Sequence, residues 1–432
     1  MNIIIFPFLF LIIFLIYDIN CFHNNYDLNP NTNNNLDYVE LNDEELIQGK
    51  KLFFESYKYY NNNILFNSPR NSNNNYTLAK YYNNTDTEDY KPFPNDELNN
   101  YKNSNECGES FISVISFEVD DEDYLYVLDE GNSNCSARLF KMKLNGNKIE
   151  ENKIYNMIKF VNTQNILLND FVIDKINNYA YIIYFDGTSK ENNQQSLELI
   201  VVDLDTKNVQ FKEIKIDFDE NYVISEELNQ SFPKIFSSFS KKLVSISLSC
   251  DAEVLFISPF ASRKIYSIST EALRESKSEF NIKEAYKNDA TLSIMASDMG
   301  NLYFWGVEQK SIFIAAQLDN DLSGFDYRGF IKKEIPENIS FISKISINDG
   351  ALLLTYKKNI NTTYIKTGFF EKRIDEDNNY EKTYIYKCTG LIYKYDWKSL
   401  FVWIIFAIIV LFIIVFVLVE NKQDLDNNKK TN

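Results

Sequence analysis

Residues 120–128 read Asp-Asp-Glu-Asp-Tyr-Leu-Tyr-Val-Leu, an acidic turn followed at once by a short apolar run typical of a β-strand. The same order, a turn-forming acidic residue before an apolar strand, recurs at four later positions, near Asp174, Asp251, Asp298 and Asp349. Successive starts lie 54, 77, 47 and 51 residues apart. A period of roughly 40–50 residues is typical of the four-stranded units that form the blades of a β-propeller.

The repeat count predicts an all-β fold, a six-bladed β-propeller over residues 44–394. A single four-stranded sheet cannot cover both of its faces, so blades bury one another by stacking around an axis. Five repeats with further chain on both sides indicate six blades. We expect the last blade to combine the strand around Ile64–Phe66 with C-terminal strands near Tyr384–Lys387, because this removes the open edge. The longest interval predicts an insertion around Asp217 to Phe232.

Composition narrows the chemistry that this chain can perform. The 432 residues carry a formal charge of −17, and a nucleic-acid partner is not expected because phosphates require a basic face. The single histidine, His23, lies at the edge of the N-terminal apolar segment, which excludes histidine bases and histidine-ligated metals from the folded domain. Residues 120–123 offer carboxylates but lack the spacing of a calcium loop, so we interpret them as a solvated turn. No cofactor and no metal are predicted.

Both ends of the chain carry long apolar segments. Ile3–Tyr17 has the length of a signal-peptide core, which predicts a signal peptide over residues 1–21; a buried N-terminal helix is the alternative. Residues 22–43 are polar and Asn-rich and are expected to form a flexible arm. Residues 400–419 are twenty apolar residues without a charge, which predicts one transmembrane helix followed by a cytoplasmic tail at 420–432. The prediction is therefore a type I membrane protein of the secretory pathway or cell surface.

The cysteines are interpreted in that secretory context, where disulfides form. Cys21 is expected to leave with the signal peptide or to lie beside the cleavage site. Four others remain, namely Cys107, Cys135, Cys250 and Cys388. The pair Cys107–Cys135 is close in sequence and flanks a strand, which favours its bonding. Cys250–Cys388 would follow by elimination, and buried free thiols are the alternative.

Several stretches of this chain match a known family in the family's order. They are Ser68-Pro69-Arg70, Lys91-Pro92-Phe93-Pro94, Cys107-Gly108-Glu109-Ser110, Tyr124-Leu125-Tyr126-Val127-Leu128-Asp129-Glu130-Gly131, Leu168-Asn169-Asp170-Phe171-Val172-Ile173-Asp174, Phe256-Ile257-Ser258-Pro259-Phe260, Ile265-Tyr266-Ser267-Ile268-Ser269-Thr270-Glu271-Ala272-Leu273-Arg274 and Asp298-Met299-Gly300-Asn301-Leu302-Tyr303-Phe304. On these residues the chain resembles the yellow / major royal jelly protein family over about Phe54 to Cys388.

The resemblance implies a six-bladed propeller whose central channel holds a small, often aromatic or amine ligand. It would place Asn301 and Tyr303 at that channel, and Asn169 and Asp170 near its mouth. An aromatic face and a carboxylate together suit a cationic amine. The alternative is that Asn169, Asp170 and Asn301 only cap turns between strands. The chain departs from the family at Ile314-Ala315-Ala316, where members usually carry a cysteine, so one family disulfide is absent or rewired.

These observations lead to a functional hypothesis. We expect a membrane-anchored extracytoplasmic β-propeller that binds an extracellular protein partner or a small aromatic or amine ligand through its loops or central channel. The alternative is an enzyme that acts on an aromatic amine or dopachrome-like substrate in the channel, using carboxylates for proton transfer. A propeller with a purely structural role is a third reading.

Overall fold

The fold is described from a computed structural model of the 432-residue chain. The structure describes residues 38–39, 56–61, 63–68, 76–82, 89–100, 107–132, 134–146, 148–157, 166–186, 196–216, 244–249, 251–259, 262–275, 280–298, 301–306, 311–316, 331–334, 341–348, 351–357, 363–367, 370–374 and 383–389. Within these residues the chain is almost entirely antiparallel β-sheet.

The strands follow the chain from sheet to sheet. The first sheet contains β2 (Ser56–Tyr60), β3 (Asn63–Asn67), β4 (Leu78–Tyr82) and β5 (Asp89–Pro92). The second contains β6 (Val114–Val119), β7 (Tyr124–Asp129), β8 (Arg138–Asn145) and β9 (Lys148–Asn156). The third contains β10 (Ile166–Asp174), β11 (Tyr179–Asp186), β12 (Ser196–Asp203) and β13 (Val209–Ile214).

The second half of the chain forms larger and more varied sheets. A seven-stranded sheet contains β14 (Val244–Leu248), β15 (Val254–Pro259), β16 (Ser262–Ser269), β17 (Lys283–Asp298), β18 (Asn301–Gly306), β19 (Ser311–Ala316) and β20 (Ile331–Glu334). The last four-stranded sheet contains β21 (Phe341–Asn348), β22 (Ala351–Lys357), β25 (Thr383–Thr389) and β1 (Tyr38–Val39). A separate hairpin contains β23 (Thr363–Thr367) and β24 (Phe370–Ile374). Two short helices are α2 (Asp96–Asn99) and α5 (Thr270–Arg274).

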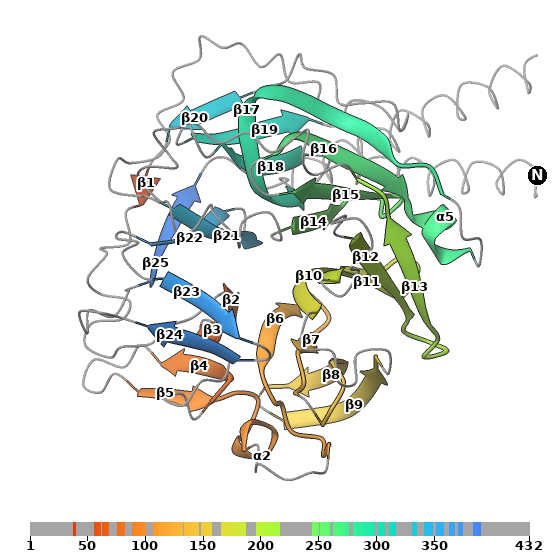
Figure 1. Cartoon of the computed structure of the whole chain (residues 1–432). Coiled ribbons are helices and arrows are strands. Elements are labelled where there is room, and N and C mark those ends of the chain that lie inside the picture. The colour runs from red at the N-terminus through yellow and green to blue at the C-terminus, as the bar shows by residue number, and fades with distance from the viewer. Residues whose placement is uncertain are drawn as a thin grey trace, which may run out of the picture.

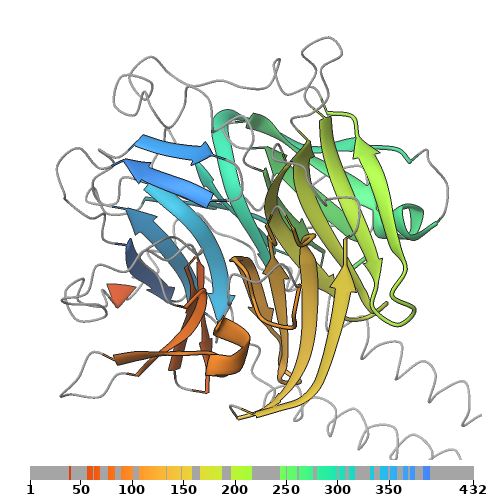
Figure 2. The ribbon, with the colours of Figure 1, turned by 60° about the horizontal axis from the view of Figure 1, so that its bottom comes forward.

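The sheets stand around a common axis, and their innermost strands close a ring (Figure 1). The strand β2 contacts β6, β6 contacts β10, β10 contacts β14, β14 contacts β17, β17 contacts β21, and β21 returns to contact β2. The long strand β17 belongs to two parts of its sheet, because its first half pairs with β16 and its second half with β18. The tilted view shows the sheets standing side by side, with their strands running from one end of the ring to the other (Figure 2).

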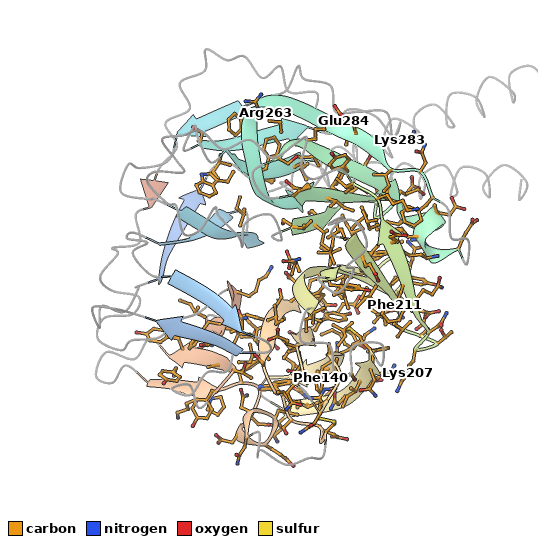
Figure 3. All side chains as sticks on the ribbon, in the orientation of Figure 1. Phe140, Lys207, Phe211, Arg263, Lys283 and Glu284 are labelled. Carbon is orange, nitrogen blue, oxygen red and sulfur yellow. A yellow bond between two sulfur atoms is a disulfide. The ribbon has the colours of Figure 1, made fainter. Side chains whose placement is uncertain are left out.

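The core lies between neighbouring sheets, and the strand β11 shows why both faces of a sheet must be apolar. Ala180, Ile182 and Tyr184 pack toward the sheet of β7 and β8, whereas the alternate residues Tyr181 and Ile183 pack toward β14 and β15. All five are 0% exposed, so a polar residue at any of them would lack a solvated face. Figure 3 shows side chains crowded between the sheets, with Lys207 and Lys283 at the outer rim.

The recurring acidic residues form the turns after the innermost strands. Asp120 Oδ1 accepts hydrogen bonds from the N–H groups of Glu122 (2.9 Å) and Tyr124 (2.8 Å). Asp174 Oδ1 accepts from the N–H of Asn177 (2.8 Å), and Asp251 Oδ1 from the N–H of Glu253 (3.0 Å). Such side-chain turns end a strand and start its hairpin. The predicted role of these three residues is confirmed, while Asp349 lies outside the described residues.

One prediction about ring closure was wrong. The segment Ile64–Phe66 does not join the C-terminal strands but lies inside β3, between β2 and β4. Instead Tyr38 and Val39 of β1 pair with Cys388 and Lys387 of β25. N-terminal and C-terminal segments of the described chain do pair, through a two-residue strand in the range 22–43 that was expected to be an arm. Ile64–Phe66 stays in the N-terminal sheet because β3 is hydrogen-bonded to β2 on one edge and to β4 on the other.

Several predictions concern residues outside the described part of the chain. They are the signal segment 1–21, the span 400–419, the tail 420–432, the insertion around 217–232 and Cys250. In the residues that the structure does describe, no helix has the length and apolar character needed to cross a bilayer.

Candidate functional site

Four of the innermost strands carry a β-bulge, and the bulges lie at the same level of the ring. The unpaired extra residues are Ile115 in β6, Asn169 in β10, Ile294 in β17 and Ser343 in β21. Each lies four or five residues before the end of its strand. A bulge bends the strand and re-aims its side chains, and bulges are enriched next to functional sites. Four of the innermost strands are therefore irregular at a similar height along the axis of the ring.

The bulge of β6 is held in place by the preceding sheet. The Nδ2 of Asn67 donates to the carbonyl oxygens of Val114 (3.1 Å) and Ile115 (2.7 Å). The N–H of Val114 donates to Oγ1 of Thr77 (2.7 Å). Asn67 and Thr77 are each 0% exposed, so the ladder groups that the bulge frees are satisfied away from water. The irregular backbone is thus a fixed part of the structure.

Polar side chains connect three neighbouring innermost strands. The Oγ of Ser116 in β6 donates to Oδ1 of Asp170 in β10 (3.3 Å), which also accepts from the N–H of Phe171 (3.0 Å). The Nζ of Lys58 in β2 lies 2.7 Å from Oε2 of Glu118 in β6. The side chains of Lys58 and Glu118 are 16% and 29% exposed, so this ion pair is partly shielded from water. We call Lys58, Ser116, Glu118, Asn169 and Asp170 the axial polar site.

The amide of Asn169 completes this site. In a regular strand Asn169 and Asp170 would point to opposite faces, but Asn169 is the extra residue of the bulge. Its Nδ2 is buried and has no hydrogen-bond partner among the described residues. The site therefore combines two carboxylates, one ammonium and one unpaired amide donor. Among the described residues of the site there are two carboxylates and one ammonium, an arrangement that favours a ligand with a cation and a hydrogen-bond acceptor.

The four residues that the resemblance implied at the channel fall into two separate pairs. Asn169 and Asp170 are adjacent on β10, an innermost strand. Asn301 and Tyr303 lie on β18, the second strand of its unit, where Asn301 pairs with Asp298 at the hairpin end and Tyr303 is 1% exposed. The structure therefore does not place the two pairs on one strand or in one sheet. A channel role for Asn301 and Tyr303 stays a prediction.

The sequence analysis missed three residues of the axial polar site, namely Lys58, Ser116 and Glu118. A signal was present in β6, where Val114, Phe117 and Val119 pack into a core cluster and Ser116 and Glu118 interrupt them. Among the described residues, no group of three or more His, Cys, Asp or Glu side chains could hold a metal.

A disulfide links the segment before β6 to the loop after β7. The sulfur atoms of Cys107 and Cys135 are 2.12 Å apart at a sequence separation of 28, and this is the predicted pairing. Cys388 lies in β25, and Cys250 is outside the described residues, so the second predicted pairing stays untested. Gly131 has φ +75°, and a Cβ there would lie 2.3 Å from the carbonyl oxygen of Cys135. Only glycine fits this close approach.

A buried ion pair between Arg138 and Asp129 lies next to this disulfide. The Nη2 of Arg138 lies 2.6 Å from Oδ2 of Asp129, and the two side chains are 3% and 0% exposed. Asp129 Oδ1 also accepts from the N–H groups of Ile112 (3.0 Å) and Ser113 (2.6 Å). Burial raises the pKa of the Asp129 carboxyl, while the Arg138 guanidinium and these N–H groups act to lower it.

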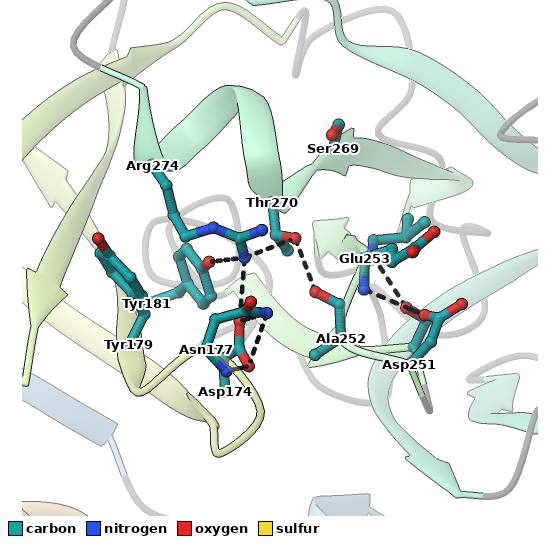
Figure 4. Close-up of polar contacts among 12 residues, drawn as sticks. Asp174, Asn177, Tyr179, Tyr181, Asp251, Ala252, Glu253, Ser269, Thr270 and Arg274 are labelled. Atoms are coloured by element: carbon teal, nitrogen blue, oxygen red, sulfur yellow. Dashed lines mark hydrogen bonds and ion pairs between the residues drawn. The ribbon is translucent and has the colours of Figure 1, made fainter. Parts of the chain in front are cut away.

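A second ion pair joins two sheets at the opposite, hairpin end of the ring (Figure 4). The Nη1 of Arg274 in α5 donates to Oδ2 of Asp174 (3.1 Å), to the hydroxyl of Tyr181 (3.3 Å) and to Oγ1 of Thr270 (3.1 Å). Burial raises the pKa of Tyr181 to about 12, although Arg274 acts to lower it, so this hydroxyl stays protonated at neutral pH. The arrangement fastens the sheet of β10 to the sheet of β14, away from the axial polar site.

Replacing Arg274 by methionine should destabilise the fold by about 2–3 kcal/mol. The change leaves the carboxylate of Asp174, which is 0% exposed, without its cation. Breaking a fully buried pair costs about 3–5 kcal/mol, and we expect less here because the Arg274 side chain is 21% exposed. Urea unfolding of the full chain measures the change. The control is Lys215→Met, whose ion pair with Glu213 is exposed and should contribute about 0–1 kcal/mol. Equal stabilities for the two variants would contradict the prediction.

Comparison with known proteins gives one family and several distant structures. The family model described as Major royal jelly protein matches residues 112–352. No curated protein matches the sequence. Among solved structures, a calcium-binding protein, regucalcin, from Agrobacterium tumefaciens has 10% identity and a TM-score of 0.43, covering 80% of this chain and 94% of its own. A putative 6-phosphogluconolactonase from Bacteroides uniformis has 8% identity and a TM-score of 0.40, covering 76% and 82%.

Proposed function

Because this chain belongs to the major royal jelly protein family, we propose that it is a six-bladed β-propeller that binds a small cationic ligand at the axial polar site. Six innermost strands in a closed ring of contacts support the blade count. On this count β17 serves twice, as the last strand of one blade and the first strand of the next. The axis of such a ring is where a propeller can surround a ligand with side chains from several blades.

One observation carries the binding proposal: at the bulge of β10, Asn169 directly precedes Asp170, and its buried amide nitrogen has no hydrogen-bond partner among the described residues. Burying a donor without an acceptor is unfavourable, and a functional role is one explanation for such a group. Asp170 is held by Ser116 and by the N–H of Phe171, which orient its carboxylate before a ligand arrives. A carboxylate has about four acceptor sites, so an ammonium can join these contacts.

The setting that we propose is the extracytoplasmic side of a membrane in the secretory pathway. The disulfide Cys107–Cys135 supports an oxidising compartment. Anchoring by residues 400–419 rests on their twenty uncharged apolar residues. Display at a membrane suits binding, and a protein partner at the disulfide-braced loop would be compatible with the same orientation.

Replacing Asp170 by asparagine tests the proposal directly. Isothermal titration of the full chain in detergent, with tyramine and tryptamine as probes, should show binding to the wild type. A charge-assisted hydrogen bond contributes about 1.5–3 kcal/mol, so Asp170→Asn should weaken binding roughly 10- to 100-fold. The matched control is Asp205→Asn, because Asp205 is an exposed carboxylate in the turn between β12 and β13. The control should bind as the wild type does.

The outcomes separate the candidate functions. Binding that Asp205→Asn weakens as much as Asp170→Asn would show only general attraction to an acidic protein. No binding of any cationic probe would reject the axial site. Chemical conversion of a probe, detected by mass spectrometry of the mixture, would instead favour the alternative, which is an enzyme that acts on aromatic amines or related quinones.

A further inference from the structure

The axial polar site requires a hydrogen-bond acceptor from its ligand as well as a positive charge. Asp170 presents acceptor atoms, whereas the adjacent Nδ2 of Asn169 is a buried donor without a partner among the described residues. An ammonium group satisfies the carboxylate but has no acceptor to offer the amide. A ligand that satisfies both residues must carry an acceptor close to its ammonium.

The ammonium of Lys58 lies near the same part of β6. Ser116 contacts Asp170, and Glu118, two residues further along β6, contacts the ammonium of Lys58. Ser116 and Glu118 are separated by one residue along β6, so the ion pair of Lys58 with Glu118 lies next to the contact of Ser116 with Asp170 along this strand. Glu118 is paired with Lys58 and is 29% exposed, which reduces its repulsion of an incoming anion. The site therefore has a carboxylate at Asp170 and, further along β6, the ammonium of Lys58, whose charge Glu118 partly offsets.

We propose that the ligand of this site is a zwitterion with an ammonium and a carboxylate on the same carbon atom, as in a free α-amino acid. The inference rests on the proposed function, because it assumes that the axial polar site binds a ligand. The ammonium binds Asp170, and the carboxylate accepts the hydrogen bond of Asn169 Nδ2 and is attracted by Lys58. An amine without the carboxylate leaves the amide of Asn169 unsatisfied.

Matched ligands separate the two charged groups. Isothermal titration of the full chain should compare tyrosine with tyramine, which lacks the carboxylate, and with 3-(4-hydroxyphenyl)propionate, which lacks the ammonium. Tryptophan, tryptamine and indole-3-propionate form a second set. A charge-assisted hydrogen bond corresponds to roughly tenfold or more in affinity, so each amino acid should bind at least about tenfold more tightly than its amine. The propionates should bind most weakly, because they bring no cation to the carboxylate of Asp170.

Two variants assign the preference to residues. Asn169→Ala should remove most of the advantage of the amino acid over its amine. Lys58→Gln should reduce the same advantage in part. The controls are Asn145→Ala, an exposed asparagine at the turn after β8, and Lys215→Gln, whose side chain is 81% exposed. Thermal unfolding of every variant establishes that the fold is retained.

The results distinguish this inference from the proposed function. Amines that bind as tightly as amino acids would overturn the inference and leave the proposed function standing. A preference for amino acids that Asn169→Ala does not change would also overturn it. Failure of all three ligand types would overturn both. A preference that disappears in Asn169→Ala and persists in Asn145→Ala supports the zwitterion.

Discussion

Replacing Arg138 by methionine is expected to lower the free energy of unfolding by about 3–5 kcal/mol, the cost of leaving one partner of a buried ion pair alone. Arg138 and Asp129 are 3% and 0% exposed, so water cannot replace the lost contact. The guanidinium also donates to the carbonyl oxygens of Gly108 (2.5 Å) and Ser110 (2.8 Å), which would lose these bonds. The methionine retains most of the apolar volume against Phe140, over which the guanidinium carbon now lies at 5.0 Å.

The loss of stability in Arg138→Met should depend on pH. Burial already raises the pKa of Asp129, and removing the guanidinium removes the largest influence that lowers it. A carboxyl whose pKa is higher in the folded state than in the unfolded state favours folding fully only below its unfolded pKa. This contribution is lost as the pH rises through the folded-state value. The difference between wild type and variant should therefore be smaller at acid pH than at neutral pH.

Urea unfolding of the full chain at pH 7 and at pH 4 measures both effects. The matched control is Lys153→Met in the same sheet, where Lys153 and Glu151 form an exposed pair with side chains 42% and 48% exposed. This control should change stability by about 0–1 kcal/mol. A loss for Arg138→Met below 1 kcal/mol, or one that grows toward acid pH, would refute the role assigned to the pair.

Removing the disulfide should lower the free energy of unfolding nearly as much as Arg138→Met does. The double variant Cys107→Ala/Cys135→Ala frees a loop of 28 residues in the unfolded chain. The loop-entropy relation gives a cost of roughly 3–4 kcal/mol for that length. Because the loop carries Gly131 and borders the first residues of β6, the same change should also loosen the end of the ring that holds the axial polar site.

The comparison requires three samples. They are the wild-type chain, the wild type reduced with dithiothreitol, and the double variant, each unfolded in urea. Reduction and double substitution should lower stability by similar amounts, and dithiothreitol should have no further effect on the variant. If reduction destabilised the double variant equally, another bond would be responsible, and the assignment to Cys107–Cys135 would fail.

The local part of this fold follows from residue pattern. Asp120, Asp174 and Asp251 were predicted as turns, and each accepts backbone hydrogen bonds within five residues of itself. These interactions need no distant partner, so a single stretch of sequence suffices to identify them. The alternation of apolar residues along β11 likewise requires two covered faces wherever the strand lies. The disulfide could be predicted because its two cysteines flank the same pair of strands.

The site was less accessible to such reasoning. Asn169 and Asp170 were recognised only through a family resemblance, and their interest depends on a bulge that no local pattern indicated. Three further site residues are polar positions in short strands, namely Lys58, Ser116 and Glu118. The sequence of a strand does not determine which neighbouring strand its side chains will contact. Ser116 contacts Asp170 across 54 positions of sequence, and Lys58 contacts Glu118 across 60, because consecutive sheets place their first strands side by side.

By itself, the sequence determined the strands, the acidic turns and the apolar faces, since each depends on interactions between residues near one another in the chain. Only the tertiary structure decided that Tyr38 and Val39 join β25, and that three innermost strands bring their polar side chains together. Both outcomes depend on closure of the ring, which sets which sheet edges and which strand faces meet. Closure is a property of all the sheets at once, so no single stretch of residues encodes it.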